Sequence, residues 1–367
     1  MPRAAKKTPS EAFREALSMV SPGSAIRVAI SAILQSSSGA LMCFGEPKKL
    51  SNLSEGGVKL DAPCTSQLLY ELSKMDGAII LNSNGTRVLY ANRILKPNDS
   101  IPSDETGTRH RAAERIARQA KCMVIAVSER RASVTLYLHD HRHILETIPT
   151  LINRATQAIQ TLEKYMRALE QALEDLTTRE FQDMVTIFDV CKAIQRCEMI
   201  TRIADEIEPY ILELGTEGRL TRLQLQELMM PLEEAELVVR DYHRQKAGLT
   251  SDQAKQRISE LPQQELFNLG AIAQALGYGP NIRTVDTYLT PRGYRVLTMT
   301  HRLTPQIVEN LVQRFESLQQ IIRAPKDELV AVEGVGEVLA ERVRVSLNLL
   351  RSQLAMDMRK DAFHQEL

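Results

Sequence analysis

The sequence predicts a multidomain α+β protein, with an N-terminal α/β domain followed by two helical regions. Three observations support this prediction. Helix and strand signals alternate through residues 1–150, a heptad pattern of apolar residues begins at Ile152, and a Gly-Val-Gly turn at 334–336 joins two helical segments. Because a chain of 367 residues can form two or three domains, we expect domains at 1–150, 151–300 and 301–367.

The N-terminal domain is expected to form around one mixed sheet. The apolar runs Ala78–Leu81 and Val88–Ala91 flank Asn84-Gly85, which is a strong signal for a β-hairpin. Short apolar runs predict further strands at 39–45, 122–128 and 132–139. Segments with helical patterns lie between them, at 24–35, 65–75 and 108–120. Helices and strands in this alternation indicate an α/β domain with helices packed on the sheet.

The middle region is predicted to be helical. Apolar residues recur at spacings of three and four, as expected for a long helix packed along a seam: Ile152, Ala155, Ile159, Leu162, Met166, Leu169, Leu173 and Leu176. Helical patterns continue to about residue 275, with Glu and Arg on the polar faces. We interpret this region as a helical linker and expect no catalytic role for it.

The C-terminal region contains the pattern of a helix, a tight hairpin and a second helix. Apolar residues flank or fill the predicted hairpin, namely Leu329, Val332, Val335, Ala340 and Val343. Gly334 and Gly336 would allow a turn whose N–H groups face a DNA phosphate, and Arg342 and Arg344 could add positive charge. The alternative is a helical hairpin with no ligand. A degenerate first copy without the glycines is expected around Leu303-Thr304-Pro305.

Composition limits the function classes. The chain has 46 Lys and Arg against 46 Asp and Glu, so a polyanion must be bound by a local patch. Aromatic residues are 4% and Trp is absent, which argues against a base-stacking surface for single strands. The five cysteines are scattered without a CxxC pair, as in a reducing cytosol. No run of 18 apolar residues predicts a membrane span.

The start of the predicted helix at 108–120 has an unusual charge. Thr108 is a good N-cap, but Arg109, His110 and Arg111 follow it, where the helix dipole is already positive. Two Arg, one His and a group of free amides are suited to a polyphosphate, which Arg can bind bidentately. The alternative is that these cations pair with Asp104, Glu105 or Glu114.

A second candidate feature is Asp76-Gly77, which lies between a predicted helix and a buried strand. At a sheet end, the carboxylate of Asp76 could bind a divalent cation or accept a proton. Gly77 would let a ligand approach the backbone closely. The alternative is a simple turn, because Asp-Gly is a common turn dipeptide.

Together, "DGA" at 76–78 and "GTRHR" at 107–111 resemble the diadenylate cyclase domain. The connecting segment "ANRILKPNDSIPSDETGTRHRAAERIA" is similar to that family nearly end to end. The whole chain resembles the bacterial DNA integrity scanning proteins, which are DisA-type diadenylate cyclases with a helical middle and a C-terminal helix-hairpin-helix DNA-binding domain. The likeness is strongest at 70–130 and 325–345.

The resemblance implies a reaction in which two ATP condense to cyclic di-AMP and two pyrophosphates, with Mg²⁺ or Mn²⁺. It implies that Asp76 lies by the ribose 3′-oxygen and the metal, and that Gly77 and Leu95 line the nucleotide pocket. It further implies a phosphate or metal contact from Ser128, and phosphate contacts from Thr108, Arg109, His110 and Arg111. Ala112 stands where many relatives have a hydroxyl residue. Loss of that hydroxyl puts one side-chain phosphate contact in doubt, but not the backbone contact.

The resemblance also implies partners and a setting. It suggests a cytoplasmic, nucleoid-associated homo-octamer with facing cyclase domains, regulated by branched DNA such as Holliday junctions, as a checkpoint in DNA damage and repair. DNA contact would come from the hairpin at 334–336 with Arg342 and Arg344. A different function class remains open, namely a non-catalytic DNA-binding scaffold whose cyclase-like domain only senses nucleotide. The intact Asp76 and Arg109-His110-Arg111 favour the enzyme.

A cluster of histidines offers one more candidate site. His139, His141 and His143 alternate, and on a strand they would share a face able to bind a transition metal. No carboxylate or Cys lies at an obvious second position in the sequence. We therefore favour a polar strand end that runs into a loop.

Overall fold

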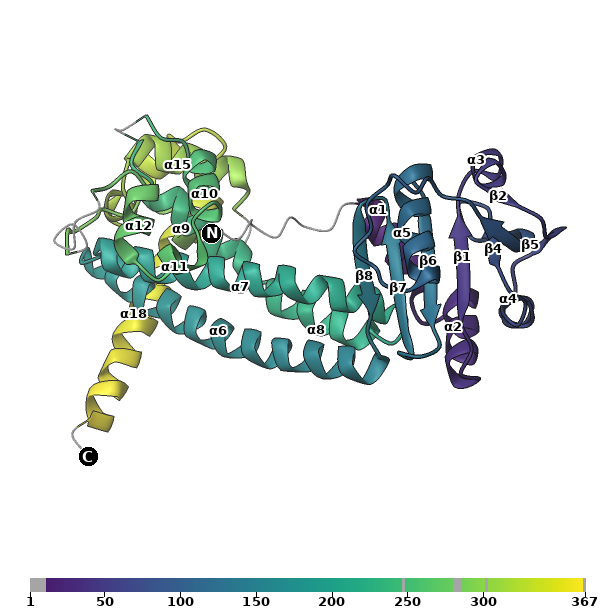
Figure 1. Cartoon of the computed structure of the whole chain (residues 1–367). Helices are drawn as coiled ribbons and strands as arrows, with labels where there is room; N and C mark the ends of the chain where they lie inside the picture. Colours follow the sequence, from purple (N-terminus) through teal and green to yellow (C-terminus); the bar gives the residue numbers. More distant parts are fainter. Residues whose placement is uncertain (1–10, 246–247, 280–285, 301–302, 366–367) are drawn as a thin grey trace. The chain divides into compact units, whose positions relative to one another are not determined.

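The computed structural model describes residues 11–245, 248–279, 286–300 and 303–365, with side chains as far as residue 356. These residues form two compact units (Figure 1). The first unit comprises the chain up to Ile159 together with Asp205–Leu225, and the second comprises Gln160–Ala204 and the chain from Gln226 onwards. The predicted domain boundaries at residues 150 and 300 stay predictions.

Within the described residues, the first unit is built on one eight-stranded mixed sheet. Its order is β2-β5-β4-β1-β6-β7-β8, with β3 also paired to β5. The strands are β1 (Ala40–Phe44), β2 (Ser54–Glu55), β3 (Val58–Pro63), β4 (Ala78–Leu81), β5 (Arg87–Leu95), β6 (Met123–Ser128), β7 (Ser133–Leu138) and β8 (His141–Leu145). Among these pairs β1 and β4 are parallel and the others are antiparallel, so the predicted mixed sheet is confirmed.

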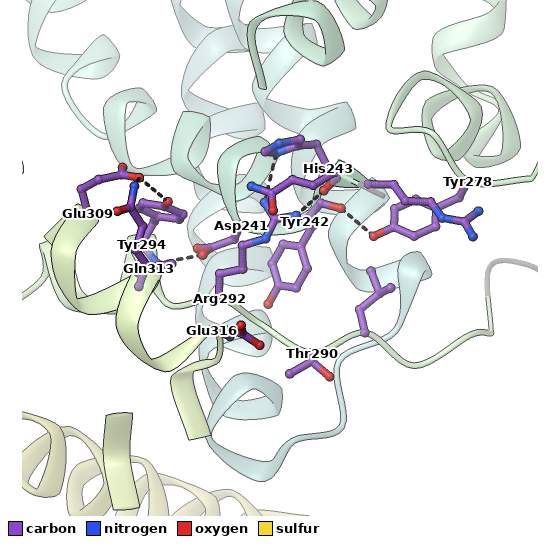
Figure 2. Close-up of a pocket in the computed structure, with 14 residues that line it drawn as sticks. Asp241, Tyr242, His243, Tyr278, Thr290, Arg292, Tyr294, Glu309, Gln313 and Glu316 are labelled. Atoms are coloured by element: carbon purple, nitrogen blue, oxygen red, sulfur yellow. Dashed lines mark hydrogen bonds between the residues drawn. The ribbon is translucent and has the colours of Figure 1, made fainter. Parts of the chain in front are cut away.

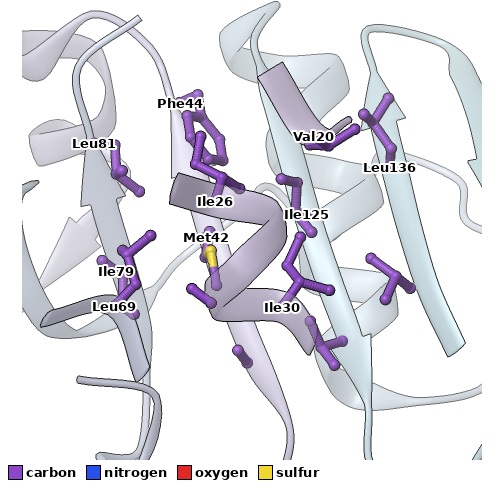
Figure 3. Packing of buried hydrophobic residues seen from close by; sticks show 14 of the residues in the cluster. Val20, Ile26, Ile30, Met42, Phe44, Leu69, Ile79, Leu81, Ile125 and Leu136 are labelled. Atoms are coloured by element: carbon purple, nitrogen blue, oxygen red, sulfur yellow. The ribbon is translucent and has the colours of Figure 1, made fainter. Parts of the chain in front are cut away.

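Helices cover both faces of this sheet. The helices are α1 (Glu11–Val20), α2 (Ala25–Gln35), α3 (Pro47–Asn52), α4 (Ser66–Ser73) and α5 (Thr108–Ala120). Residues of α1, α2 and α4 share one core with alternate residues of the strands, as Figure 3 shows for Ile30, Met42 and Ile125. Residues of α3 and α5 share the other core, with Cys43 and Val124. The strand β1 is buried on both faces, which is why it reads as a continuous apolar run.

The predicted hairpin and the long helix are both confirmed. β4 and β5 pair antiparallel on either side of Asn84-Gly85, and α6 (Ile148–Gln182) spans the heptad pattern. One heptad position is wrong, because Ile152 is 41% exposed and its neighbour Leu151 is buried instead. The remaining helices as far as residue 279 are α7 (Ile187–Leu214), α8 (Arg219–Met229), α9 (Leu232–Tyr242), α10 (Ser251–Ser259), α11 (Gln263–Leu266) and α12 (Leu269–Ala275).

The C-terminal helices form an internal repeat. They are α14 (Tyr294–Thr298), α15 (Pro305–Phe315), α16 (Leu318–Arg323), α17 (Lys326–Val330) and α18 (Glu337–Gln365). The pair α17 and α18 begins 32 residues after the pair α14 and α15, at 326 against 294 and at 337 against 305. Buried positions repeat with the same offset, as in Leu297 and Leu329, Val308 and Ala340, and Leu311 and Val343. His301 and Arg302, in the first copy, lie outside the described residues.

The two copies differ at the start of their second helix. In the first copy the Thr304 side chain accepts a hydrogen bond from the Ile307 N–H at 3.4 Å and so caps α15. In the second copy the equivalent residue is Gly336, which has no side chain to cap α18. The predicted core positions of the second hairpin are confirmed, with Val335 only 4% exposed.

No single helix among the described residues is both long and apolar enough to cross a membrane. The consecutive helices α1 and α2 reach that length and composition only as a pair, and the chain bends by 57° between them.

Candidate active site

The edge of the sheet that includes Asp76 brings several predicted site residues together. Because β1 and β4 are parallel, Gly39 and Gly77, which precede these strands, lie at the same edge. The antiparallel neighbours β5 and β6 end at that edge, with Leu95 and Ser128. From β4 to β6 is two strand spacings, or roughly 10 Å. The order along the edge is therefore Leu95, Gly77, Gly39 and Ser128.

The start of α5 lies at this same edge. The Arg109 Nη1 donates to the Val127 carbonyl, in β6, at 3.4 Å. A Cβ on Gly39 would lie 1.9 Å from that Nη1, so the guanidinium fits only because residue 39 is glycine. Sequence reasoning missed Gly39, and its one signal was a glycine directly before a buried strand.

Sequence reasoning placed the N-cap of α5 one residue too late. Gly107 is the N-cap, with φ −86° and ψ 139°, and Thr108 is the first helical residue. Gly107 has no side chain that could accept a hydrogen bond from the N–H groups of the first turn. The first helical hydrogen bond runs from the Arg111 N–H to the Gly107 carbonyl at 2.9 Å. The N–H groups of residues 108–110 therefore have no acceptor among the described residues.

The positive charge at this helix start is not neutralised by a neighbouring carboxylate. Neither Arg109 nor Arg111 forms an ion pair within the part of the chain that the structure describes. Of the three acids that could have paired with them, Glu105 forms an ion pair with Arg142 at 2.8 Å, and Glu114 pairs with Arg118 at 2.8 Å. Asp104 forms no ion pair among the described residues. The simple pairing alternative is therefore wrong, and the cluster is open to an anion.

His110 is half-buried beside these arginines. Its ring meets the Tyr137 ring edge to face, with 6.4 Å between centroids and planes at 76°. Burial lowers the pKa of His110, and the charges of Arg131, Arg109 and Arg142 lower it further, while Glu105 acts in the opposite direction. These effects favour the neutral ring, whereas a bound phosphate would favour its protonation.

Asp76 and Gly77 are exposed at the start of β4. The Asp76 carboxylate has no hydrogen-bond or ion-pair partner among the described residues. Gly77 has φ +95°, and a Cβ there would lie 2.9 Å from the Arg93 carbonyl oxygen. The close approach that requires this glycine is thus to the backbone of β5. Contact of Gly77 with a ligand stays a prediction, as does that of Leu95.

One other predicted phosphate contact has a local role in the structure. Ser128 Oγ accepts from the Arg131 N–H at 3.3 Å in the β6–β7 turn. Ala112 lies at the start of the second turn of α5 and is half-buried. Their contact with a phosphate also stays a prediction.

The histidine cluster does not form a metal site. The described residues contain no group of three or more His, Cys, Asp or Glu placed to hold a metal ion. His141 and His143 belong to β8, so the segment that was expected to be a loop after residue 139 is a strand. His139 lies in the turn before it, with φ +54°. His143 Nε2 lies 2.8 Å from the Glu213 carboxylate, so its role is structural.

At the second hairpin, Gly334 has φ +84°, and the Val335 N–H donates to the Val332 carbonyl at 3.0 Å. The N–H groups of Gly336, Glu337 and Val338 have no acceptor among the described residues. Arg344 lies 3.4 Å from Glu341, whereas Arg342 has no ion-pair partner within the described part of the chain. The hairpin thus presents free amides with little net positive charge.

A cavity of about 710 Å³ lies in the second unit, between the end of α9 and α15 (Figure 2). No predicted site residue lines it. Two of its charged side chains are used internally, since Arg292 donates to the Arg240 carbonyl at 2.7 Å and Glu309 accepts from Tyr294 at 3.2 Å. We assign it no function.

Comparisons with known proteins show the family of this chain. Residues 27–142 match the family model described as "DisA bacterial checkpoint controller nucleotide-binding", and residues 145–285 match "DisA bacterial checkpoint controller linker region". The DNA integrity scanning protein DisA of Carboxydothermus hydrogenoformans is 44% identical over 339 residues, 92% of this chain and 96% of that protein. The same protein of Symbiobacterium thermophilum is 43% identical over 346 residues, covering 94% and 97%.

A search of solved structures also finds a double mutant of DacA from Staphylococcus aureus. It is 25% identical, covers 36% of this chain and 88% of that one, and has a TM-score of 0.30.

Proposed function

The chain belongs to the family of DNA integrity scanning proteins, and from this membership we propose that it is a diadenylate cyclase whose activity is coupled to DNA binding. The proposed reaction condenses two ATP into cyclic di-AMP and two pyrophosphates. One observation supports it above the others. The start of α5 combines three free N–H groups with two unpaired arginines, at the sheet edge that also includes Asp76.

The reaction is a pair of phosphoryl transfers. The 3′-oxygen of each ATP forms a bond to the α-phosphorus of the other, the bond from that phosphorus to the bridging oxygen breaks, and pyrophosphate leaves. One chain provides one such site, so two cyclase domains must face each other across a two-fold axis. We extend the proposal to a homo-octamer, in which such pairs recur.

Each residue at the edge has a role in this proposal. Leu95 and Gly77 border the adenosine, and Asp76 accepts the proton of the attacking hydroxyl or orients it. The free amides at 108–110, with Arg109 and Arg111, bind the triphosphate and stabilise the charge that develops on the leaving pyrophosphate. Ser128 completes the phosphate contacts, whereas the Ala112 N–H lies within the hydrogen-bonded part of α5.

The residues present are suited to a divalent metal that binds together with the nucleotide. Asp76 offers one exposed carboxylate without a protein partner, and the described residues offer no larger ligand set. One carboxylate plus phosphate oxygens and water is a common environment for Mg²⁺, and Mn²⁺ accepts similar ligands. When bound, the metal would neutralise phosphate charge and polarise the α-phosphate.

We further propose that the second hairpin is a helix-hairpin-helix that binds a DNA phosphate through its backbone. The free amides at 336–338 and the positive φ of Gly334 support this contact. Arg342 and Arg344 would add non-specific phosphate contacts. Such weak, shape-dependent binding is suited to branched DNA such as a Holliday junction, with affinity raised by several copies in one oligomer.

The competing function is a DNA-binding scaffold that senses ATP without turning it over. The test is to incubate the purified full-length protein with ATP and Mg²⁺ or Mn²⁺ and to assay cyclic di-AMP and pyrophosphate, with and without branched DNA. We expect one cyclic di-AMP for two pyrophosphates, and a change in rate when DNA binds. ATP binding without product in either metal would favour the scaffold.

A further inference from the structure

Glu105 is a buried acid in the loop that leads into α5. Its side chain is 8% exposed, and it lies two residues before the N-cap Gly107. The carboxylate forms no ion pair with Arg109 or Arg111 among the described residues. Its Oε1 accepts a hydrogen bond from the Tyr137 hydroxyl at 2.8 Å and forms an ion pair with the Arg142 Nε at 2.8 Å. A buried carboxylate is costly unless it is paired in this way, so its position is well defined.

The rest of this loop is attached to α5 itself. Arg115 donates to the Ile101 carbonyl at 2.9 Å, Arg118 donates to the Pro102 carbonyl at 2.5 Å, and Ser103 bonds to Glu114. In residues 99–107, all of which are described, the Glu105 carboxylate is the group that connects to the sheet, by a hydrogen bond to β7 and an ion pair to β8. It therefore attaches the loop before α5 to these strands.

Two members of the cationic cluster depend on this connection. The Glu105 carbonyl accepts from the Arg111 Nε at 3.3 Å. The Tyr137 ring, 1% exposed, supports the His110 ring edge to face. Burial raises the pKa of Tyr137, and its hydrogen bond to Glu105 adds to the rise, so this hydroxyl remains a donor at all physiological pH values. Glu105 thus acts on both His110 and Arg111 without facing the ligand.

We propose that Glu105 is a positioning residue of the phosphate site, which fastens the loop before α5 to Tyr137 and Arg142 and so sets where His110 and Arg111 meet a triphosphate. The inference rests on the proposed function, because it assumes that the cluster binds ATP. It deepens that function, because it names a residue that contacts no substrate but determines the positions of His110 and Arg111.

The test compares Glu105→Ala, Glu105→Gln and Tyr137→Phe in the full-length protein. The affinity for α,β-methylene ATP with Mg²⁺ is measured by calorimetry, and kcat and KM for ATP are measured by product assay. We expect Glu105→Ala to weaken analogue binding and to raise KM about tenfold, a loss typical of a mispositioned ion-binding group. Glu105→Gln should stay within about threefold of wild type, because its Oε1 can still accept the hydrogen bond from the Tyr137 hydroxyl, and only the charge that pairs with the half-exposed Arg142 is lost.

Tyr137→Phe keeps the ring against His110 but removes one donor, so its effect should be intermediate. The double variant that combines Tyr137→Phe with Glu105→Ala should bind the analogue no more weakly than Glu105→Ala alone, because both changes break the same hydrogen bond. Asp99→Ala is the matched control. This acid lies in the same loop and binds Arg115, but its side chain is 94% exposed, so wild-type affinity is expected.

Wild-type analogue affinity and KM in a folded Glu105→Ala protein would overturn the proposal. A loss in Glu105→Gln as large as in Glu105→Ala would also overturn it, since hydrogen-bond geometry would then not be the cause. If Glu105→Ala does not fold, Tyr137→Phe decides, and an unchanged analogue affinity in that variant rejects the connection. Wild-type protein that binds the analogue but makes no cyclic di-AMP would refute the proposed function alone, because the calorimetric series still tests Glu105.

Discussion

Two helix starts in this chain share a backbone design but differ in charge. α5 follows Gly107 and α18 follows Gly336, so neither has a side-chain cap and both expose free N–H groups. After Gly107 come Thr108, Arg109, His110 and Arg111, whereas Glu337 directly follows Gly336. The helix dipole alone supplies about half a positive charge at the N-terminus of each of these two helices. The difference shows which end is equipped for a small, highly charged anion.

The start of a third helix, α15, makes the contrast clearer. α15, the repeat partner of α18, has its first turn closed by the Thr304 side chain. A closed helix start needs no external anion, whereas an open one gains from binding an anion. We therefore expect tight, charge-dependent binding of ATP at α5, weak backbone binding of DNA at α18, and none at α15.

The largest expected effect is on turnover at the α5 site. Asp76→Asn removes an anionic metal ligand or proton acceptor while keeping the shape of the side chain. We expect cyclic di-AMP synthesis to fall by about a thousandfold or more. Thermal stability should not change, because Asp76 is exposed and has no partner among the described residues. Product assay and calorimetric melting test this, and wild-type turnover would remove Asp76 from the mechanism.

Arg109→Ala tests the charge at α5 directly. We expect kcat/KM for ATP to fall about a hundredfold, since a bidentate phosphate contact is lost and no neighbouring carboxylate is freed. The matched control is Arg344→Ala on α18, which should leave turnover without DNA unchanged. Equal effects of the two substitutions would mean that α5 has no special role.

Gly39→Ala tests how the sheet holds Arg109. The added methyl would overlap the guanidinium, whose Nη1 lies 1.9 Å from the ideal Cβ position, so the flexible side chain must move. We expect a roughly tenfold rise in KM for ATP with little loss of stability, because residue 39 does not have a positive φ. In the Arg109→Ala background the same change should have no further effect, since the overlapping group is gone. An additional tenfold loss there would contradict this explanation.

Much of the fold could be predicted because its signals are local. The Asn-Gly hairpin and the heptad pattern of α6 are set by neighbouring residues and were found. The cations at 109–111 could be recognised as unusual for the same reason. The short strands β2 and β3 were missed, since each depends on pairing with β5, distant in sequence. β8 was taken for a loop because its polar residues face outward on an edge strand.

The residues of the candidate site could be predicted from the sequence, but the contacts that hold them in place could not. Thr108 looked like the N-cap because it has the better side chain, yet the backbone turns into the helix at Gly107. Glu105 was one alternative partner for the arginines, because it is near them in sequence. Its actual partners, Tyr137 and Arg142, lie on strands more than 30 positions away, and no local pattern reveals that contact.

The hairpin before α18 should be tested by adding side chains to its glycines. A Cβ on Gly336 would meet nothing within 4 Å, so Gly336→Ala should fold normally while covering a free amide. Gly334→Ala forces alanine into φ +84° and should also lower stability, by about 1 kcal/mol. We expect DNA affinity to fall about tenfold in the double variant, alike for all sequences, because phosphate contacts carry no base information. Unchanged affinity would exclude this hairpin as the DNA contact.

The smallest expected effect comes from making α18 more like α5. Glu337→Gln removes the negative charge from an open helix start, and the side chain is 79% exposed with one weak partner, Lys326 at 3.3 Å. We expect DNA affinity to rise about two- to fivefold at low salt, the range for one charge at a helix end. The gain should shrink as salt is added, because the interaction is screened. Stability and ATP turnover without DNA should not change.

Glu341→Gln is the matched control for this variant, because Glu341 lies on the same helix one turn further from its start and pairs with Arg344. Dipole effects are confined to the first turn, so its gain should be smaller than that of Glu337→Gln. The measurement is the affinity of both variants for branched and linear DNA across a salt series. Equal gains would indicate a general effect of net charge. No gain from Glu337→Gln at low salt would mean that DNA does not approach the start of α18, and that only α5 uses its open helix end.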